Sequence, residues 1–487
     1  MKTISIDPIT RLEGHGKISI FLDENGNVAN AFLQIPELRG FEKFCEGRRA
    51  EDMPIITTRI CGVCPVAHHL ASAKALDAAF SAQPTDTAKK LRELMYAGYF
   101  IYDHILHFYF LGSPDFIVGP DAHPSERNIV GVLRKMGFDI VREVIRHRAY
   151  GQKITEILGG KATHPVSALP GGVSKGLSEA ERSEIESMAR SSVKFALSTI
   201  NIFNDVFLKS SEYLEMIHAD ELQLKTYNMG LVDESNKMNF YDGDIRVTDQ
   251  NGREVFRFKG SDYLKYVAEH VEPWTYSKFT YLKKIGWKGL IDGSDSGVYR
   301  VGPLARLNVA EGMSTPLADE EYRRMFETIG GKPVNSTFAY HWARIIELLY
   351  ASERALELST DPSIMGSDLR NPIGEPGEGV GVVEAARGTL IHHYKIDDKG
   401  LVQKANLIVA TTNNYSDICI SIREAAKKLI QGGKVDEGLL NRVEMAYRAY
   451  DPCFGCSTHT FSNNQSLTVE IYDAKGSLHQ ILERRGN

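Results

Sequence analysis

The sequence predicts an α+β protein in which a bundle of long helices forms the core and small β-sheets lie at the periphery. Apolar residues recur with a helical period over several long stretches, whereas strand-like alternation is confined to short segments. Hydrophobic residues make up 43% of the 487 residues and charged residues 25%, the composition of a folded chain. The length would allow about three domains, but no low-complexity spacer separates them. We therefore expect one large domain over residues 1–459, followed by an extension over residues 460–487.

The N-terminal region is expected to form a small antiparallel sheet over residues 3–35, where apolar and polar residues alternate on both sides of a turn. Two helices follow, from Val63 to Ser81 and from Thr85 to Leu111. A proline lies in the break between them, and Thr85 or Asp86 is the expected N-cap of the second helix. Both helices have the length of core-forming elements.

Two further long helices are predicted in the middle of the chain. One runs from about Ser125 to Leu158 and ends at a glycine pair, and the other runs from Ser178, within a capping-type sequence, to about Leu222. Short strands are expected between about 224 and 260, and a hairpin over Lys395 to Ala410. We interpret the Gly/Pro-rich segment 371–381 as a loop that shapes the functional site.

The charge balance excludes several classes of function. The chain contains 57 Lys and Arg and 63 Asp and Glu, which gives a formal net charge of −6. It therefore lacks the excess of positive charge that binding to nucleic acid or to an anionic membrane requires. Asp7 lies where a signal peptide needs its apolar core, and no run of about 18 apolar residues could span a bilayer. We therefore expect a cytoplasmic protein that binds no nucleic acid and has no membrane span.

Four of the six cysteines form two CxxC pairs near opposite ends of the chain, Cys61 with Cys64 and Cys453 with Cys456. A CxxC pair can direct two sulfurs at one ion, and four thiolates suit zinc, an iron–sulfur cluster or nickel. Structural zinc is the simplest interpretation, but zinc ribbons usually separate their pairs by about 15–20 residues. A chain with a large core gains little stability from a structural metal ion. A site assembled from both ends of such a chain therefore favours a catalytic metal over a structural one.

Six motifs surround or accompany these cysteines. They are Asp7 to His15, Leu38 to Glu42, Arg59 to His68, Asp103 to Tyr109, Glu384 to Thr389, and Asp451 to His459. Together they resemble the large subunit of nickel–iron hydrogenases, in the same order and with closely similar spacings. The segment 299–308 and the residues of the last motif resemble most closely those of the soluble, multi-subunit branch of these hydrogenases. That branch couples hydrogen to nicotinamide, deazaflavin or heterodisulfide partners.

The resemblance implies the nickel–iron hydrogenase large-subunit fold and an oxidoreductase that cleaves H₂ heterolytically and reversibly. The four paired cysteines would hold nickel, and Cys64 and Cys456 would also bridge to an iron that carries carbon monoxide and cyanide. The proton would leave through Cys456 and Glu13, because a buried carboxylate beside thiolates has a raised pKa.

The electrons need another protein, since no cysteines remain for a relay cluster. We therefore expect an iron–sulfur small subunit, together with further flavin and iron–sulfur subunits. The segment around His164 resembles the part of the family that approaches the partner's nearest cluster.

Further roles follow from the resemblance alone. Arg387 would donate hydrogen bonds to cyanide, Asp103 and Asp451 would lie around this arginine, and His68 would hydrogen-bond a bridging sulfur. Where many relatives have proline before the arginine, this chain has Ala386.

The resemblance also implies a magnesium ion held by Glu42, His459 and the backbone carbonyl of Leu407, although a nitrogen ligand is unusual for magnesium. In the family, a maturation endopeptidase cuts after the histidine that matches His459, which would remove residues 460–487. The pattern of this extension is that of a β-hairpin, so a retained hairpin on the surface is the alternative.

Two other classes of function stay open. One is a redox-silent scaffold subunit like the related quinone-reducing subunit of respiratory complex I, whose members lack the four cysteines. The other is a binding protein whose fold is stabilised by structural zinc. Elemental analysis separates them from the enzyme, because only the enzyme requires nickel and iron.

Overall fold

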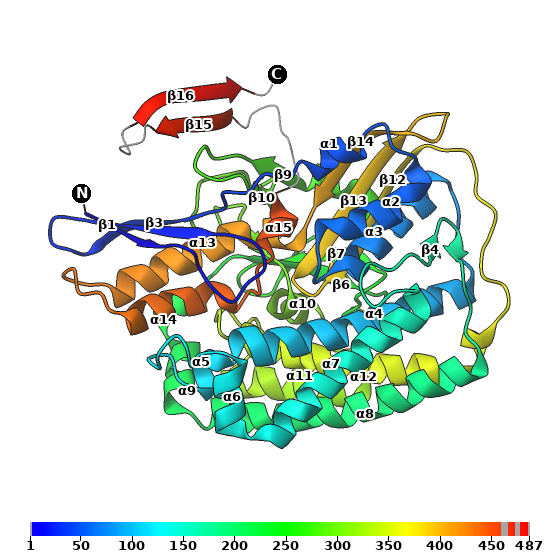
Figure 1. Cartoon of the computed structure of the whole chain (residues 1–487), viewed down its shortest axis with the longest axis horizontal. Coiled ribbons are helices and arrows are strands. Elements are labelled where there is room, and N and C mark those ends of the chain that lie inside the picture. The colour runs from blue at the N-terminus through cyan, green and yellow to red at the C-terminus, as the bar shows by residue number, and fades with distance from the viewer. Residues whose placement is uncertain (1, 459–465, 473–477, 486–487) are drawn as a thin grey trace.

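The computed structural model describes residues 2–458, 466–472 and 478–485, and it confirms the predicted α+β class. Four long helices form one layer, α4 (Asp86–Leu106), α7 (Phe138–Gly159), α8 (Glu179–Phe203) and α12 (Ala339–Thr360). In this layer α4 packs against both α7 and α12, and α12 packs against α8. Figure 1 shows the sheets and the remaining helices above and beside these helices.

The predicted N-terminal sheet is confirmed. It consists of β1 (Lys2–Ile6), β2 (Lys17–Leu22) and β3 (Val28–Gln34), paired antiparallel in that order. Ile18 and Ile20 of β2 are fully buried, and helix α13 (Ala410–Leu429) packs against β3. The sheet is thereby fixed to a helix from the C-terminal part of the chain.

The two helices predicted after the first cysteine pair are also present. Helix α3 (Pro65–Ala79) begins with a proline directly after Cys64. Helix α4 is capped by Thr85, whose hydroxyl accepts a hydrogen bond from the N–H of Ala88 at 3.1 Å. It continues into a π-helical turn, His107–Gly112.

The prediction of single helices from Ser125 to Leu158 and from Ser178 to Leu222 is wrong. The first is divided into α6 (Ile129–Met136) and α7 by Gly137, whose φ of +89° is open to glycine and rare for other residues. The second is divided into α8 and α9 (Ser211–His218), because Ser210 caps a new helix. Apolar periodicity continues across both breaks, so it did not reveal them.

A mixed four-stranded sheet follows. It contains β6 (Tyr227–Val232), β7 (Asp244–Thr248), β8 (Glu254–Phe258) and β11 (Tyr299–Arg300), and β11 runs parallel to β6. The strands expected between 224 and 260 are therefore confirmed.

The third sheet consists of β12 (Glu378–Ala385), β13 (Gly388–Ile396) and β14 (Val402–Ile408), paired antiparallel. The hairpin predicted near 395–410 is its second half, and the sequence analysis missed β12. The prediction that 371–381 shapes the site is wrong. Gly374 donates to the carbonyl of Phe80 at 2.7 Å, so this segment lies at the end of α3 opposite Cys64. Gly379 and Gly381 instead let α3 pack on β12, since a Cβ at Gly381 would lie 2.1 Å from the oxygen of Ala71.

The C-terminal extension contains β15 (Ser466–Tyr472) and β16 (Leu478–Arg485), which pair antiparallel. The predicted hairpin is therefore confirmed, and Figure 1 shows it outside the packed layers.

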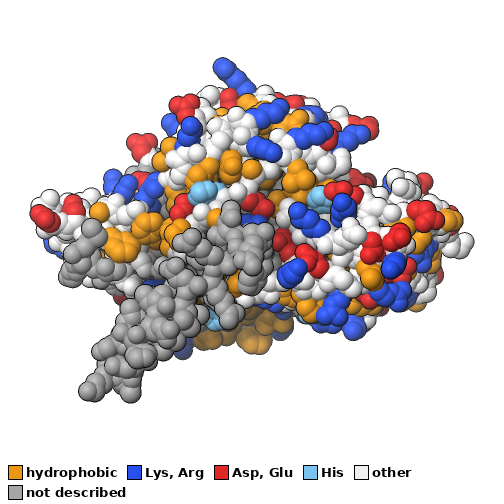
Figure 2. Space-filling model, turned by 90° about the horizontal axis from the view of Figure 1, so that it is seen from above, with side chains coloured by type: hydrophobic (Ala, Val, Ile, Leu, Met, Phe, Trp, Pro, Cys, Tyr) orange, Lys and Arg blue, Asp and Glu red, His pale blue; other side chains and the backbone are white. Residues whose placement is uncertain are grey.

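The other helices and strands in the described ranges complete the fold. They are α1 (Phe41–Cys45), α2 (Met53–Ile56), α5 (Pro114–Ile117), α10 (Pro303–Val309), α11 (Pro316–Ile329), α14 (Glu437–Arg448), α15 (Phe454–Ser457), β4 (Ala168–Leu169), β5 (Gly172–Val173), β9 (Val267–His270) and β10 (Phe279–Leu282). None of the described helices is long and apolar enough to cross a membrane. Figure 2 shows acidic and basic side chains interspersed over the described part of one face.

Candidate metal centre

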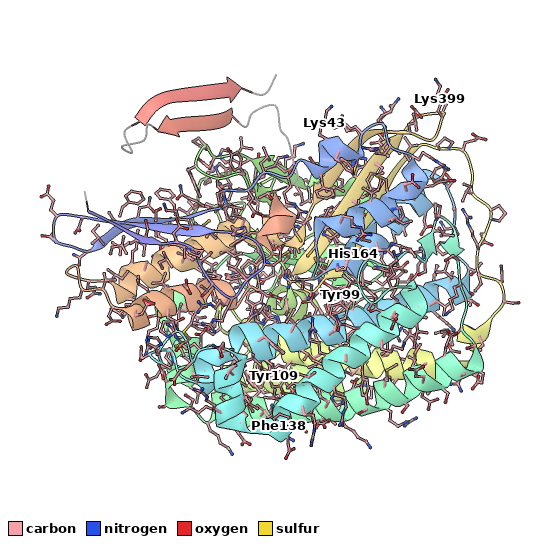
Figure 3. The ribbon with its side chains drawn as sticks, viewed as in Figure 1. Lys43, Tyr99, Tyr109, Phe138, His164 and Lys399 are labelled. Atoms are coloured by element: carbon pink, nitrogen blue, oxygen red, sulfur yellow. The ribbon has the colours of Figure 1, made fainter. Side chains whose placement is uncertain are left out.

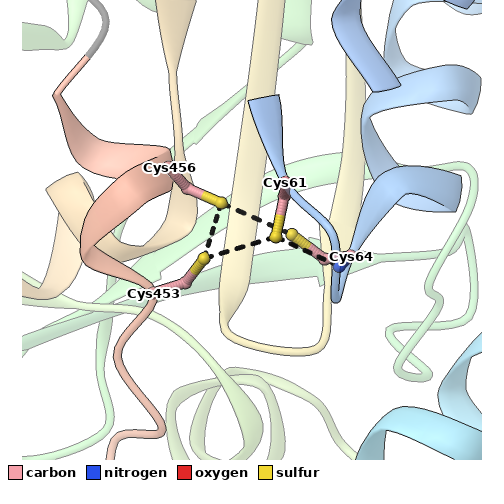
Figure 4. A group of neighbouring side chains, drawn as sticks. All are labelled: Cys61, Cys64, Cys453 and Cys456. Carbon is pink, nitrogen blue, oxygen red and sulfur yellow. Dashed lines mark hydrogen bonds between the residues drawn. The ribbon is translucent and has the colours of Figure 1, made fainter. Parts of the chain in front are cut away.

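The two cysteine pairs meet at one point. Cys61 and Cys64 lie in the turn before α3, and Cys453 and Cys456 lie immediately before and within α15. All four Sγ atoms lie within 4.8 Å of one another (Figure 4), with 3.4 Å between Cys61 and Cys453 and 3.6 Å between Cys64 and Cys456. A metal–thiolate bond is about 2.3 Å long, so one ion can reach all four sulfurs. The residues therefore fit a tetrathiolate metal centre.

The surroundings of the cluster favour thiolate at Cys61. All four side chains are buried. The backbone N–H groups of Val63 and Cys64 both point at the Sγ of Cys61, each at 3.2 Å. Burial alone would raise the pKa of Cys61, but hydrogen bonds from the neighbouring thiols lower it well below its ordinary value. Burial raises the pKa of Cys453 and Cys456. A bound cation would replace the protons that these thiols share.

Glu13 lies directly against the second cysteine pair. Its carbonyl accepts a hydrogen bond from the N–H of Phe454 at 2.9 Å. Its Oε2 lies 2.8 Å from the Sγ of Cys453 and accepts from the N–H of Gly455 at 3.1 Å. A Cβ at Gly455 would lie 2.7 Å from the Glu13 carboxylate, so a larger residue here would displace this carboxylate. Burial and, next, the negative charge of Cys61 raise the pKa of Glu13.

The sulfur that contacts the Glu13 carboxylate is that of Cys453. The resemblance implied a proton route through Cys456 and Glu13. The parallel bridge between Glu13 and Cys453 is the reason for the observed contact. The CxxC spacing does not indicate which of the two sulfurs faces the N-terminal segment that contains Glu13.

The backbone that carries Glu13 is fixed by a buried ion cluster that the sequence analysis missed. Arg11 has a φ of +59° and pairs with Asp115, which is 1% exposed. Arg448 donates to Asp115 at 3.1 Å and to the hydroxyl of Thr10 at 3.1 Å. The Arg11 in the first motif was the signal that could have indicated this cluster.

Arg387 occupies the turn between β12 and β13 and is 3% exposed. It donates to Asp103 at 3.2 Å and to Asp451 at 3.1 Å, so the expected grouping of these three residues is confirmed. Burial opposes the charge, but Asp103 and Asp451 raise the pKa of Arg387 well above its ordinary value. Its Nε has no acceptor among the described residues. A buried donor of this kind fits a group with acceptor atoms beside the sulfurs.

A second buried network, also missed, holds the strand end before Arg387. Arg306 donates two hydrogen bonds to Glu347, at 2.6 and 2.7 Å, and one to Glu384 at 2.7 Å. His104 lies 2.9 Å from Glu347. All four side chains are buried. The segment 299–308, noted above only for its resemblance, contains this arginine.

His68 is buried, and burial lowers its pKa to about 4. Its Nδ1 lies 3.1 Å from the Nε2 of His392, a residue to which the sequence analysis gave no role. His392 in turn contacts the hydroxyl of Tyr394 at 2.9 Å. The described contact of His68 is therefore to a second histidine and not to a bridging sulfur.

The residues expected at magnesium come together in part. The Oε1 of Glu42 accepts a hydrogen bond from the N–H of Leu407 at 2.7 Å, and both residues are buried. Glu42 contacts the N–H of Leu407 and not its carbonyl, which is the group expected to bind magnesium. In an antiparallel strand, the N–H and the carbonyl of one residue point to the same edge of the strand. His459 lies outside the described residues.

Arg39 is a further residue that the sequence analysis did not assign. Its side chain donates to the carbonyls of Ile60 at 2.5 Å and Gly455 at 3.0 Å, and its N–H donates to the carbonyl of Thr458 at 2.7 Å. Ile60 directly precedes Cys61, Gly455 directly precedes Cys456, and Thr458 follows the second cysteine pair. Arg39 thus joins the two halves of the centre.

Comparison with known proteins identifies relatives along nearly the whole chain. The family model described as nickel-dependent hydrogenase matches residues 39–127 and 215–459, and a model described as HoxL-like matches residues 3–38. The chain is 50% identical to an iron-sulfur subunit of the F420-non-reducing hydrogenase of Archaeoglobus profundus, over 98% of this chain and 99% of that protein. It is 37% identical to the beta subunit of the NAD-reducing hydrogenase HoxS of Cupriavidus necator, over 98% of each.

Two solved structures extend the comparison. An NAD⁺-reducing [NiFe]-hydrogenase in the H₂-reduced state has a TM-score of 0.89 at 39% identity, covering 94% of this chain and all of that one. A Ni-Fe-Se hydrogenase from Desulfovibrio vulgaris Hildenborough has a TM-score of 0.74 at 25% identity, with the same coverage.

Proposed function

The chain belongs to the nickel-dependent hydrogenase family, and we propose that its four paired cysteines hold the centre at which this nickel–iron hydrogenase cleaves H₂. The convergence of the four sulfurs within 4.8 Å carries the proposal. All four cysteines would hold nickel, and Cys64 and Cys456 would also hold iron. Soft thiolates match this metal pair.

The bound nickel–iron group would supply a Lewis acid and an electron acceptor for heterolytic cleavage. The protein's own part is to take the proton. The Cys453 thiol lies 2.8 Å from the Glu13 carboxylate, a distance at which a proton can pass directly between them. Burial favours the protonated form of Glu13, so this carboxyl group can hold the proton before passing it on.

Arg387 would bind the diatomic ligands of iron, which we propose to be carbon monoxide and cyanide. Its Nε is a buried donor with no acceptor among the described residues. Asp103 and Asp451 hold the guanidinium from two sides and so fix the direction in which the Nε points. Infrared spectroscopy of the metal-loaded protein tests this step. Bands of metal-bound carbon monoxide and cyanide support it, and their absence contradicts it.

We further propose that a separate iron–sulfur subunit takes the electrons. The two cysteines outside the pairs, Cys45 and Cys419, are both buried singly, so they offer no relay cluster. The partner would approach near His164 (Figure 3), whose Nδ1 lies 3.0 Å from the carbonyl of Thr58, three residues before Cys61. Purification under mild conditions should yield a complex with an iron–sulfur subunit.

The terminal acceptor would be selected by further flavin and iron–sulfur subunits. The Archaeoglobus relative is named as F420-non-reducing, and we propose that this complex does not reduce F420 either. The test is hydrogen-dependent reduction of F420, NAD⁺ and a viologen dye by the purified complex. Reduction of the dye without reduction of F420 supports the proposal, and rapid F420 reduction contradicts it.

We also propose that a maturation endopeptidase removes residues 460–487, and that magnesium binds at Glu42, the Leu407 carbonyl and His459. Arg39 and the carbonyl of Thr458 already join the segment before the proposed cut to the first cysteine motif. Intact-mass spectrometry of active, nickel-loaded protein tests the cut. A mass that ends at His459 supports it, whereas a full-length mass with full activity contradicts it.

A further inference from the structure

The turn that carries Arg387 contains only two residues. Ala385 pairs with Gly388 at the end of the hairpin, so Ala386 and Arg387 form the loop. Neither has a positive φ, which excludes the turn types that need a left-handed central residue and agrees with type I, the commonest turn. Rotation of the Ala385–Ala386 peptide in this turn would change where the side chain of Arg387 begins.

Four polar backbone groups of this turn have a side chain as their partner. Arg306 donates to the carbonyl of Ala385 at 2.8 Å and to that of Ala386 at 3.2 Å. Asn414 donates to the carbonyl of Arg387 at 3.0 Å. The fourth of these groups is the N–H of Ala386, which donates to the hydroxyl oxygen of Tyr99 at 3.0 Å.

Tyr99 belongs to a row of polar side chains on α4. Tyr96, one turn before it, donates to the carbonyl of Glu384 at 2.5 Å, and Asp103, one turn after it, binds Arg387. Residues three and four apart share one helix face. The helix therefore contacts the end of the β12–β13 hairpin at three successive points, and Figure 3 shows Tyr99 in the interior of the molecule.

We propose that Tyr99 is a positioning residue for the hydrogenase reaction, because its phenol oxygen accepts the Ala386 N–H and thereby fixes the turn from which Arg387 points. The proposal rests on the role proposed above for Arg387. Both Tyr99 and Ala386 are 0% exposed, so an N–H that lost this acceptor would have no water to replace it. The peptide would rotate to find another acceptor and would carry Arg387 with it.

A double-mutant cycle tests this coupling. Tyr99→Phe removes the acceptor and keeps the ring. Ala386→Pro removes the donor, and proline suits this place because it is favoured at the second position of a type I turn and requires an extended residue before it, as Ala385 is. Tyr109→Phe is the matched control, since Tyr109 is equally buried but its hydroxyl contacts Thr199 at 2.9 Å, away from the turn.

We expect Tyr99→Phe to lower kcat about tenfold and to shift the infrared bands of the iron ligands, with nickel and iron retained. Tyr109→Phe should change neither. In the Ala386→Pro background, the Tyr99→Phe change should not lower kcat further, because the Tyr99 hydroxyl has no N–H of residue 386 left to bind. Unchanged kcat and bands in Tyr99→Phe would overturn the proposal.

If Tyr99→Phe alone does not accumulate as a folded complex, the comparison of Ala386→Pro with the double variant decides. Equal kcat and equal bands support the coupling, and a further loss in the double variant overturns it. A failure of the function proposed above is recognised separately, because the unmodified protein would then lack nickel or hydrogen uptake.

Discussion

The Glu13 carboxylate and the Cys453 thiol lie 2.8 Å apart, although 440 positions separate the two residues in the sequence. Their backbones form a parallel bridge, so the contact is built into the fold and does not depend on side-chain flexibility alone. In the function proposed above, this pair joins the metal centre to the first group that receives the proton.

Glu13→Gln should therefore separate proton transfer from metal binding. Glutamine keeps the shape and can still accept from the N–H of Gly455, but it cannot take a proton. We expect hydrogen/deuterium exchange with solvent to fall about a hundredfold or more, with nickel and iron still bound. Glu37→Gln, at a partly exposed carboxylate that pairs with His15, should leave exchange unchanged. Normal exchange in Glu13→Gln would show that the proton takes another route.

Replacement of any paired cysteine should abolish nickel retention or hydrogen uptake. A serine hydroxyl is a poor ligand for a soft metal, and the four sulfurs lie within 4.8 Å of one another, so we propose that all four bind the metals. Cys45→Ser and Cys419→Ser are the controls and should retain both metals. Elemental analysis and hydrogen uptake provide the measurement, and full activity in Cys61→Ser, for example, would refute the ligand set.

Arg387→Lys should lower turnover about a hundredfold, because an ammonium group cannot reproduce the planar guanidinium that binds Asp103 and Asp451 at once. Metal content should stay the same, which separates this effect from that of a lost ligand. Arg49→Lys at an exposed ion pair with Glu51 is the control. Normal kinetics in Arg387→Lys would mean that this arginine only supports the fold.

Stability should fall in mild acid through His69. Its Nδ1 lies 2.7 Å from the carbonyl of Pro54 and its Nε2 accepts from the N–H of Ala168 at 2.9 Å, so the ring is bound in its neutral form. Burial lowers its pKa to about 4, from an ordinary value of 6.5. Between these values the unfolded chain binds a proton that the folded chain does not.

The free energy of unfolding therefore decreases as pH falls from about 6.5 to about 4, by up to about 1.4 kcal/mol per pH unit for this one proton. The thermal unfolding midpoint, measured at pH 7 and pH 5, should drop less in His69→Gln than in the unmodified protein. An equal drop in both proteins would contradict this account.

The sequence predicted the parts of this molecule that local patterns specify. Alternation predicted β2 and β3, and the Ser178–Glu181 capping box predicted the start of α8. The same patterns did not predict the break at Gly137, because one glycine in an apolar helical period can be tolerated or can end the helix. Only tertiary packing decides between these outcomes.

The candidate site was predicted through its motifs, and the motifs carried no information on contacts across the chain. Asp103, Arg387 and Asp451 could be grouped from the resemblance, but the pairing of Glu13 with Cys453 depends on register between the two ends. The buried partners of the motif residues, such as Glu347, are ordinary helix residues in the sequence. Their role appears only when α12 packs against α4.

The central claim is that the four cysteines hold a nickel–iron centre that cleaves hydrogen. The most direct test measures the metals and the hydrogen uptake of the same protein sample, purified without oxygen in complex with its partner subunits. The account predicts nickel together with a larger amount of iron, because the iron–sulfur partners also contain iron, and hydrogen-dependent reduction of a viologen dye that is lost in Cys453→Ser. Zinc alone, without hydrogen uptake in the unmodified complex, would contradict it.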